Sequence, residues 1–475
     1  MFSLRRHRGW NRRTIFALAF IAVFVFVAGC QQNQPEVPVR VLAEPSGGMA
    51  PASEELASGP AEIILRMHGS NTIGSSLAPS LSKAYLQKLG AGAIEVKPGK
   101  VDEEKTVEAM LGGRHVGIEI FAHGSSTAFA DMGNDATDIG MASRRVKPDE
   151  VTSLSALGNL RAPQSEHILG LDGIAVIVHR DNPLDKLSVE QIGQLFSGGV
   201  TNWNQAGGVD VAVKVYSRDS VSGTFDTFKS LVLSPNNLAV VDSARFFEDS
   251  EKLADSVAAD PGGIGFIGLP YIREAKAVSV YQDDSVPLLP NSFTVGTEDY
   301  LLSRRLFLYT PATSENKHVG DFVEFALSGE GQRIAAEEGF IPNVITPASP
   351  ALAEDTPRRY AESVQGAQRL SVNFRFESGS NDLDNKAQRD LDRLVTYIER
   401  TKPTEVMLVG FTDSHGSLEK NMSLSYSRAN GVGRLLRDKG ISQLKIAGFG
   451  PYLPVASNGG EDGRAKNRRV EVWTR

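Results

Sequence analysis

Three short loops rich in glycine, serine and threonine could together bind a small anion. They are Ser70–Gly74, Ser125–Thr127 and Asp219–Thr224, and each follows an apolar run and precedes a helical pattern. Such loops present backbone N–H groups and hydroxyls at a helix N-terminus, where the macrodipole is positive. Arg218, directly before the third loop, adds a planar guanidinium that suits a tetrahedral oxyanion. Any one loop could equally be an ordinary helix N-cap, but three in one block favour a shared oxyanion site.

An α/β framework is needed to bring these loops to one cleft. Apolar runs predict strands at Glu62–Met67, Gly117–Ala122, Ile174–Val178 and Val211–Tyr216. Leu77, Leu81, Tyr85 and Leu89 share one face of a predicted helix, and Ser188 to Gln191 is a capping box that predicts another. This alternation predicts α/β architecture with mainly parallel strands over residues 61–345.

Six stretches of this block resemble PstS-like phosphate-binding proteins of the periplasmic binding protein superfamily. They are GSNTIG, AHGSSTAF, TDIGMASRR, LDGIAVIVHRDNPLDKLSVEQIGQLFSGGVTNW, SRDSVSGTFDTF and DPGGIGFIG. The resemblance implies two α/β lobes that close on the ligand like a flytrap (type II). By motif position, Thr72, Ile73 and Ser125 would offer backbone N–H groups or hydroxyls. Arg218, Ser222, Gly223 and Thr224 would clamp the ligand from the other side.

One residue departs from the family pattern. Phosphate-specific members carry an acid after the DIG-x-A-S motif, and it accepts the proton of a protonated phosphate. Here Ser143 is followed by Arg144, which cannot accept a hydrogen bond. We therefore expect an oxyanion ligand, with phosphate as the first candidate, and leave the choice between phosphate and sulfate open.

The second block, residues 369–475, shows the order β-α-β-α-β-β, which predicts a small α/β sandwich. Asp413 opens the loop after the second strand, and Arg428 lies on the helix that follows. A carboxylate and a guanidinium facing one pocket could bind a zwitterion, or could form a structural ion pair.

The motifs GFTDSHG, LSYSRANGV and GRAKNRRVEV, together with Asn421 and a GFG followed by Pro454, resemble the OmpA-like peptidoglycan-binding domain. That family binds the diaminopimelate of cell-wall peptide stems. The resemblance implies that Asp413 takes the ligand's ammonium group and that Arg428 takes its carboxylate. Asn421 and Leu424 would shape the pocket, while Arg468 and Arg469 would brace the fold.

The N-terminus has the order of an export signal: a basic head, the apolar run from Thr14 to Val27, and small residues before Cys30. Val27 to Cys30 resembles a bacterial lipobox, which implies cleavage after residue 29 and lipidation of Cys30. Gln31 in place of an aspartate implies the outer membrane, with the protein facing the periplasm. The alternative is an uncleaved N-terminal anchor. Residues 30–60 are expected to form a flexible tether and residues 346–368 a linker.

Charge and composition exclude other classes. Without residues 1–29 the chain has 45 basic and 57 acidic residues, a net charge of −12, with −17 over residues 30–368 and +5 from residue 369 onward. Such a balance argues against nucleic-acid binding. One cysteine excludes an internal disulfide or a cysteine metal cluster, and the GxGxxG at Gly263–Gly268 lacks the strand-before, helix-within context of a dinucleotide site.

We expect no cofactor, no metal and no catalysis. The sequence predicts an outer-membrane lipoprotein that binds an oxyanion and attaches to peptidoglycan, with an ABC permease or an envelope protein as a possible further partner. The competing hypothesis is a structural tether between membrane and wall whose upper domain has lost its ligand and contacts a protein.

Overall fold

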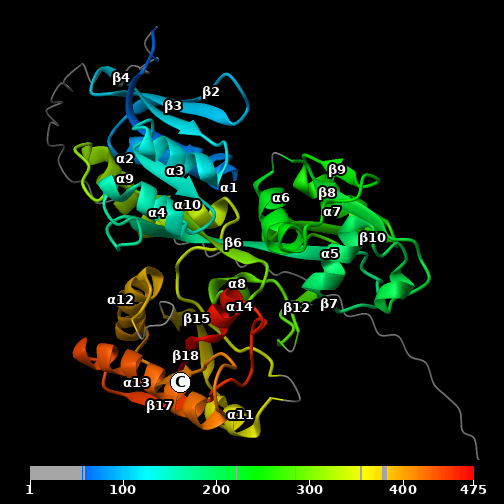
Figure 1. Cartoon of the computed structure of the whole chain (residues 1–475). Helices are drawn as coiled ribbons and strands as arrows, with labels where there is room; N and C mark the ends of the chain where they lie inside the picture. Colours follow the sequence, from blue (N-terminus) through cyan, green and yellow to red (C-terminus); the bar gives the residue numbers. More distant parts are fainter. Residues whose placement is uncertain (1–55, 57–58, 221, 284, 353–355, 377–381) are drawn as a thin grey trace, which may run out of the picture. The chain divides into compact units, whose positions relative to one another are not determined.

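In the computed structural model, one long strand belongs to both lobes of the N-terminal α/β block (Figure 1). The first half of β6 (Glu166–Val178) pairs antiparallel with β13 (Ser303–Tyr309), and its second half pairs with β10 (Gly263–Gly268). Nearly every residue of β6 is buried, as expected for a strand covered on both faces. We call β6 and β13 the crossing strands. The predicted two-lobed α/β fold is confirmed.

The first lobe is built around β1, with β4 and β5 as its parallel neighbours. Its core includes Leu65, Met67, Leu81 and Ile120, which are fully or almost fully buried. Its elements are β1 (Glu62–Gly69), α1 (Asn71–Gly74), α2 (Leu77–Lys88), β2 (Gly92–Pro98), β3 (Glu104–Leu111), β4 (Arg114–Phe121), α3 (Ser125–Gly133), β5 (Ile139–Ala142), α4 (Pro148–Ser153), α9 (Lys317–Leu327) and α10 (Gly329–Glu337).

The second lobe packs around β10 and β8, which are parallel to each other. Its core includes Phe196, Phe228 and Phe266, and the rings of Phe228 and Phe266 stack at 4.0 Å between centroids. Its elements are β7 (Lys186–Ser188), α5 (Val189–Ser197), β8 (Lys214–Arg218), α6 (Gly223–Phe228), β9 (Arg245–Phe247), α7 (Ser250–Ala259), β11 (Lys276–Ala277), β12 (Ser279–Tyr281) and α8 (Ser292–Gly296), together with β10.

The pairing is more mixed than the expected parallel arrangement. The strands run β2-β3-β4-β1-β5-β13-β6-β10-β8-β9, with β11 beside β6. Parallel pairs join β1 to its neighbours and β8 to β9 and β10, but β2-β3-β4 and both edges of β13 are antiparallel. The two-residue turn Gly112-Gly113 explains one exception, because so short a connection can join only antiparallel strands.

The local signals for helix starts are confirmed. Ser188 caps α5, with its Oγ accepting from the Gln191 N–H at 3.0 Å while the Gln191 side chain accepts from the Ser188 N–H at 2.9 Å. The three predicted helices also follow their strands: β1 leads to α2, β4 to α3, and β8 to α6. The first predicted loop is not irregular, because Asn71–Gly74 forms the short helix α1.

The C-terminal domain has the predicted β-α-β-α-β-β order with one helix added before the last strand. Its sheet runs β14-β15-β18-β16-β17, and Leu394, Leu408, Val432 and Val472 lie in its core. Its elements are β14 (Pro347–Ala348), α11 (Arg358–Val364), β15 (Gln368–Arg375), α12 (Asn385–Thr401), β16 (Val406–Gly410), α13 (Leu418–Asp438), β17 (Leu444–Gly448), α14 (Glu461–Asn467) and β18 (Arg469–Thr474).

The segment expected to be a linker contributes to this domain. β14 pairs with β15, and Tyr360 on α11 is buried against Phe411, Phe449 and Trp473. The Tyr360 hydroxyl donates to Glu471 at 2.7 Å. Aromatic packing and this hydrogen bond hold α11 on the sheet.

Ser53–Arg475 forms one compact unit. Within it, buried charged side chains of the binding-protein block hydrogen bond to side chains of the C-terminal domain. Asp299, which is 2% exposed, accepts hydrogen bonds from Arg369 at 2.6 Å, from Asn373 at 2.8 Å and from Arg375 at 3.3 Å. Burial would raise the pKa of Asp299, but the charges of Arg369, Arg469 and Arg375 outweigh it and lower the pKa.

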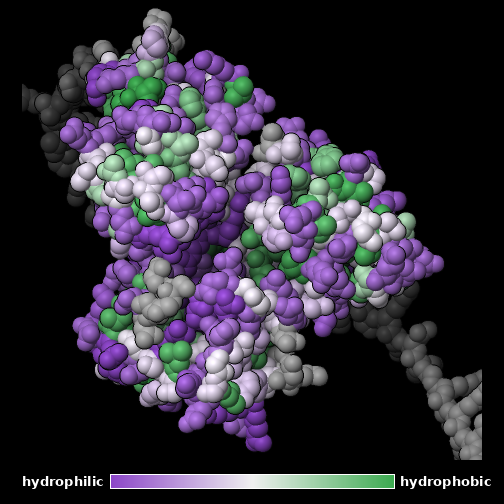
Figure 2. All heavy atoms as spheres, in the orientation of Figure 1, coloured by the Kyte–Doolittle hydropathy of each residue, from purple (hydrophilic) through white to green (hydrophobic). Residues whose placement is uncertain are grey.

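The structure describes residues 56, 59–220, 222–283, 285–352, 356–376 and 382–475. The predicted signal, Cys30 and nearly all of the tether lie outside these ranges. Among the described helices, none is long and apolar enough to cross a membrane. The face shown in Figure 2 is mostly hydrophilic, and its hydrophobic residues form small scattered patches.

Replacing Glu471 by alanine should loosen the C-terminal sheet. Glu471 is buried and accepts from Arg469, Tyr360 and Trp473, so its loss leaves a buried guanidinium and two other donors without their acceptor. Removing one partner of a buried ion pair costs about 3–5 kcal/mol. Hydrogen exchange of the β15 and β18 amides should accelerate accordingly. Glu362→Ala, which removes an exposed pair with Arg358, is the control and should cost under about 1 kcal/mol; equal protection in both variants would contradict the assignment.

Candidate functional site

The carboxyl ends of β1, β4 and β5 lie side by side and carry two of the three predicted loops. The Gly124 N–H donates to the Gly69 carbonyl at 2.7 Å, and the Ser70 N–H donates to the Met141 carbonyl at 2.8 Å. Gly69 has φ +136°, and a Cβ there would lie 2.0 Å from the Met141 oxygen, so only glycine fits. These backbone contacts hold the Thr72 and Ser125 loops at one edge of the sheet.

Ser125 and Ser143 form a hydroxyl pair at this edge. Their Oγ atoms lie 3.1 Å apart, and the Ser143 N–H donates to the Ser125 Oγ at 3.0 Å. Ser125 also begins α3, whose first-turn N–H groups carry the positive end of the helix dipole. The side chain of Ile73, by contrast, is fully buried in the lobe's core, so only its backbone is available to a ligand.

The two lobes meet at Thr72 and Gly223. The Thr72 Oγ1 donates to the Gly223 carbonyl at 3.3 Å, and a Cβ on Gly223 would lie 2.6 Å from the Thr72 Cα. Ser222 is buried and caps α6 by accepting from the Phe225 N–H, while Thr224 is half-buried. The structure therefore brings the first predicted loop against the third.

Arg218 does not join this contact. Its Nε donates to the Phe247 carbonyl at 3.1 Å, and its Nη1 donates to the Ser250 Oγ at 2.6 Å. Burial lowers the pKa of Arg218. The predicted clamp arginine is held by the end of β9 and the start of α7, both in its own lobe.

Arg144 is also held within its own lobe. Its guanidinium donates to both carboxylate oxygens of Glu150, at 2.8 and 2.6 Å, and lies 5.0 Å from the centre of the Phe129 ring. Burial would raise the pKa of Glu150, but the hydrogen bonds from Arg144 and from the Lys147 backbone outweigh it and lower the pKa. The arginine that replaces the family's acid is thus neutralised locally and is hydrogen bonded at one end of α4.

Sequence reasoning missed Arg304 and Asp172, which are paired across the crossing strands. The Arg304 side chain is 9% exposed, and its Nη2 donates to the Thr72 Oγ1 at 2.6 Å and to the Gly223 carbonyl at 3.0 Å. Neither residue lies in a glycine- or serine-rich loop. The available signal was the charged pair Arg304-Arg305 inside an otherwise apolar strand.

The second candidate site is in the C-terminal domain, where Asp413 follows β16. Its Oδ1 accepts from the His415 N–H at 3.0 Å, and its Oδ2 pairs with Arg468 at 3.0 Å. Asn421 is buried and donates to the His415 carbonyl, which fixes the same loop. A carboxylate has about four lone-pair sites, so Asp413 retains capacity for an ammonium group.

Arg428 is buried, and its Nε and Nη1 have no hydrogen-bond partner among the described residues. Its guanidinium lies 5.2 Å from the centre of the Phe376 ring. Burial and the charge of Arg468 lower the pKa of Arg428. Unsatisfied buried donors are rare in proteins, and a carboxylate ligand would satisfy these two.

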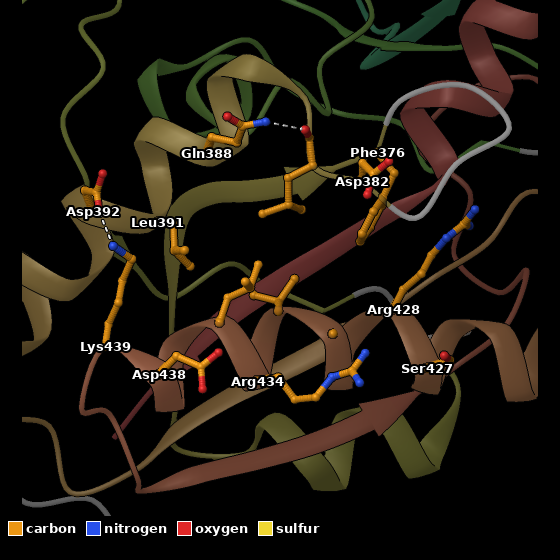
Figure 3. A pocket seen from close by; sticks show the side chains of 14 residues that line it. Phe376, Asp382, Gln388, Leu391, Asp392, Ser427, Arg428, Arg434, Asp438 and Lys439 are labelled. Atoms are coloured by element: carbon orange, nitrogen blue, oxygen red, sulfur yellow. Dashed lines mark hydrogen bonds and ion pairs between the residues drawn. The ribbon is translucent and has the colours of Figure 1, made fainter. Parts of the chain in front are cut away.

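Arg428 stands at one end of a cavity of about 780 Å³ between α12 and α13. Figure 3 shows its side chain extending past Phe376, while at the other end Lys439 pairs with Asp392 at 2.7 Å. Leu424 is half-buried one turn before Arg428. Arg468 contacts Asp413 and Glu461, and the Arg469 guanidinium lies 4.0 Å from the centre of the Phe411 ring.

Models of two known protein families match parts of this chain. A model of the PBP superfamily domain matches residues 87–330, just over half of the chain. The chain belongs to the PBP superfamily. A model of the OmpA family matches residues 375–468, so this PBP-superfamily protein carries a C-terminal OmpA domain.

Two curated relatives of this superfamily member are similar along most of their own length. The phosphate-binding protein PstS of Staphylococcus saprophyticus is 28% identical over 293 residues, which are 60% of this chain and 82% of that protein. Protein SphX of Synechococcus elongatus is 28% identical over 286 residues, which are 57% of this chain and 82% of that protein.

Solved structures resemble each part separately. An ABC-type phosphate transport receptor from Vibrio cholerae has a TM-score of 0.45 at 22% identity and covers 58% of this chain and 99% of its own. The peptidoglycan-associated lipoprotein from Burkholderia pseudomallei has a TM-score of 0.21 at 27% identity and covers 22% of this chain and 89% of its own.

Proposed function

We propose that the PBP-superfamily domain binds an inorganic oxyanion, with phosphate as the first candidate. The observation that carries the proposal is the contact of Thr72 with Gly223 between the lobes, next to the Ser125–Ser143 hydroxyl pair. Hydroxyls and backbone N–H groups from both lobes can then donate to one tetrahedral ion. The names of relatives such as phosphate-binding protein PstS support the same ligand and support binding rather than catalysis.

The acidic charge of this block does not oppose the proposal. Fixed dipoles act at short range, whereas the net charge of distant surface carboxylates is screened by salt beyond about 10 Å. The nine-residue helix α3 begins at Ser125 and so directs its positive end toward the edge that carries Thr72. The carboxylates that lie close to the lobe contact, Asp172 and Asp226, are both paired with Arg304.

The OmpA domain is proposed to bind the diaminopimelate of peptidoglycan peptide stems. Arg428 supplies buried, unpartnered N–H donors for a carboxylate, and Asp413 supplies carboxylate oxygens for an ammonium group. Arg468 would orient Asp413, and Asn421 would hold the loop in place. The charge of this part of the chain adds only a weak attraction to an anionic wall.

The N-terminal segment is proposed to anchor the chain in the outer membrane through a lipidated Cys30. A tether of 30 residues reaches at most about 100 Å when fully extended. A receptor held by lipid and wall would be suited to capture or buffering of the anion near the outer envelope, or to sensing through a partner, more than to simple delivery to a permease. Mass spectrometry of the mature N-terminal peptide should find diacylglycerol on Cys30, and an unmodified thiol there would contradict the anchor.

A second function has one observation in its favour. Arg218 and Arg144 are each bonded within their own lobe, as expected if the cleft no longer binds an anion. The chain would then be a structural tether between membrane and wall whose upper domain contacts a protein. Anion titration separates the two functions.

Calorimetry on phosphate-stripped residues 53–475 should show binding of phosphate. Gly223→Ala should weaken that binding about 10–100-fold, because the added Cβ would overpack the contact with Thr72 when the lobes close. Gly320→Ala is the matched control, since a Cβ there meets no atom within 4 Å and alanine favours the helix. No heat from either phosphate or sulfate in the unchanged protein would favour the structural tether.

Pull-down with purified sacculi should retain the unchanged protein and lose both Arg428→Ala and Asp413→Ala. Each variant removes one of the two opposite charges that a zwitterionic ligand needs, and a buried charge pair is worth about 2–5 kcal/mol on truncation. Arg437→Ala, an exposed change on the same helix α13, should bind like the unchanged protein. Undiminished retention of both site variants would disprove the assigned roles of Arg428 and Asp413.

A further inference from the structure

Arg304 is the one described side chain that hydrogen bonds to both residues of the lobe contact. It stands on the crossing strand β13, opposite Asp172 on β6, and its side chain is 9% exposed. Its Nη2 donates to the Thr72 Oγ1 of the first lobe at 2.6 Å and to the Gly223 carbonyl of the second at 3.0 Å. The guanidinium therefore lies where the two lobes close.

Two carboxylates pair with the Arg304 guanidinium, each at a long distance. Asp172 lies 3.5 Å from the Nε and Asp226 lies 3.6 Å from the Nη1, and the Nε has no hydrogen-bond partner among the described residues. Asp172 already accepts from the Thr227 hydroxyl at 3.0 Å, and the Asp226 side chain is half exposed. A buried guanidinium with an unsatisfied N–H is rare, and its planar fork can donate two hydrogen bonds to one oxyanion.

Arg304 also lines a cavity of about 480 Å³ together with Ser143, Arg144 and residues of the C-terminal domain such as Arg375 and Lys466. Thr72 and Gly223 do not line this cavity. Ser143 is hydrogen bonded to Ser125, so the cavity lies against one of the predicted anion-binding loops. Arg144 is held in a bidentate pair with Glu150.

We propose that Arg304 is a second arginine of the oxyanion site, in addition to Arg218, which the family resemblance assigns to the clamp. This inference rests on the proposed function of the same cleft. When an anion enters, the Thr72 hydroxyl turns from the Gly223 carbonyl to the ligand, and the Arg304 Nη2 turns from Thr72 to the same ligand. Because Arg304 stands on β13 where it pairs with β6, at the junction of the lobes, it donates to the anion from a strand and not from a loop.

The alternative explanation is that Arg304 only neutralises the charge of Asp172. A charge-matched pair of variants separates the two roles. Arg304→Met leaves Asp172 without its cation, whereas Arg304→Met combined with Asp172→Asn removes both charges. If neutralisation is the only role, the double variant binds anions like the unchanged protein; if Arg304 donates to the ligand, it does not.

The test is calorimetry of phosphate-stripped residues 53–475 with inorganic phosphate and, separately, with sulfate. Arg304→Met should weaken binding about 100-fold or more, and the double variant should remain at least about tenfold weaker than the unchanged protein. Arg304→Lys should fall between them, because it keeps the charge and loses the fork. Lys229→Met, an exposed charge removal beside α6, controls for net charge.

Circular dichroism and thermal unfolding of each variant exclude loss of the fold as the cause, and the double variant, which buries no unmatched charge, keeps the test open if Arg304→Met fails to fold. Full binding by the double variant would overturn the role of Arg304 and leave the proposed function standing. Absence of binding by the unchanged protein would overturn both.

Discussion

The antiparallel pairing of β6 with β13 is the constraint on which the binding domain depends. β6 is one continuous strand that passes from the sheet of the first lobe into that of the second, so both lobes share its hydrogen bonds. Residues on the crossing strands are therefore held in place at the junction, whereas each anion-binding loop belongs to one lobe. Asp172 and Arg304 occupy that junction, which places a largely buried charge pair beside the Thr72–Gly223 contact.

Buried charges recur as a structural device in this chain. Glu471 links Arg469, Tyr360 and Trp473 within the C-terminal domain, and Asp299 accepts from Arg369 and Arg375. A buried ion pair adds little net stability over a hydrophobic core, but breaking one partner is strongly unfavourable. Such networks specify which surfaces pack together, which explains how an expected linker becomes a helix with Tyr360 in the core of the sheet.

Much of the fold was predictable because its signals are local. The capping box at Ser188, the loops after β1, β4 and β8, and the strand–helix order of the C-terminal domain depend on residues a few positions apart. Antiparallel pairing of β2, β3 and β4 was not predicted, since apolar runs indicate strands and carry no information on their direction. The order of the strands depends on connections and burial across the whole block.

The sequence by itself determined the composition of both candidate sites: hydroxyl-rich loops at Thr72, Ser125 and Ser222, and the pair Asp413 and Arg428. Only the tertiary structure decided which guanidinium meets which loop. Arg218 turns to Ser250, Arg144 turns to Glu150, and Arg304, from a strand far along the chain, reaches Thr72. The physical reason is that a side chain's partner is set by the packing of distant segments and by the desolvation of its charge, neither of which is encoded in neighbouring residues.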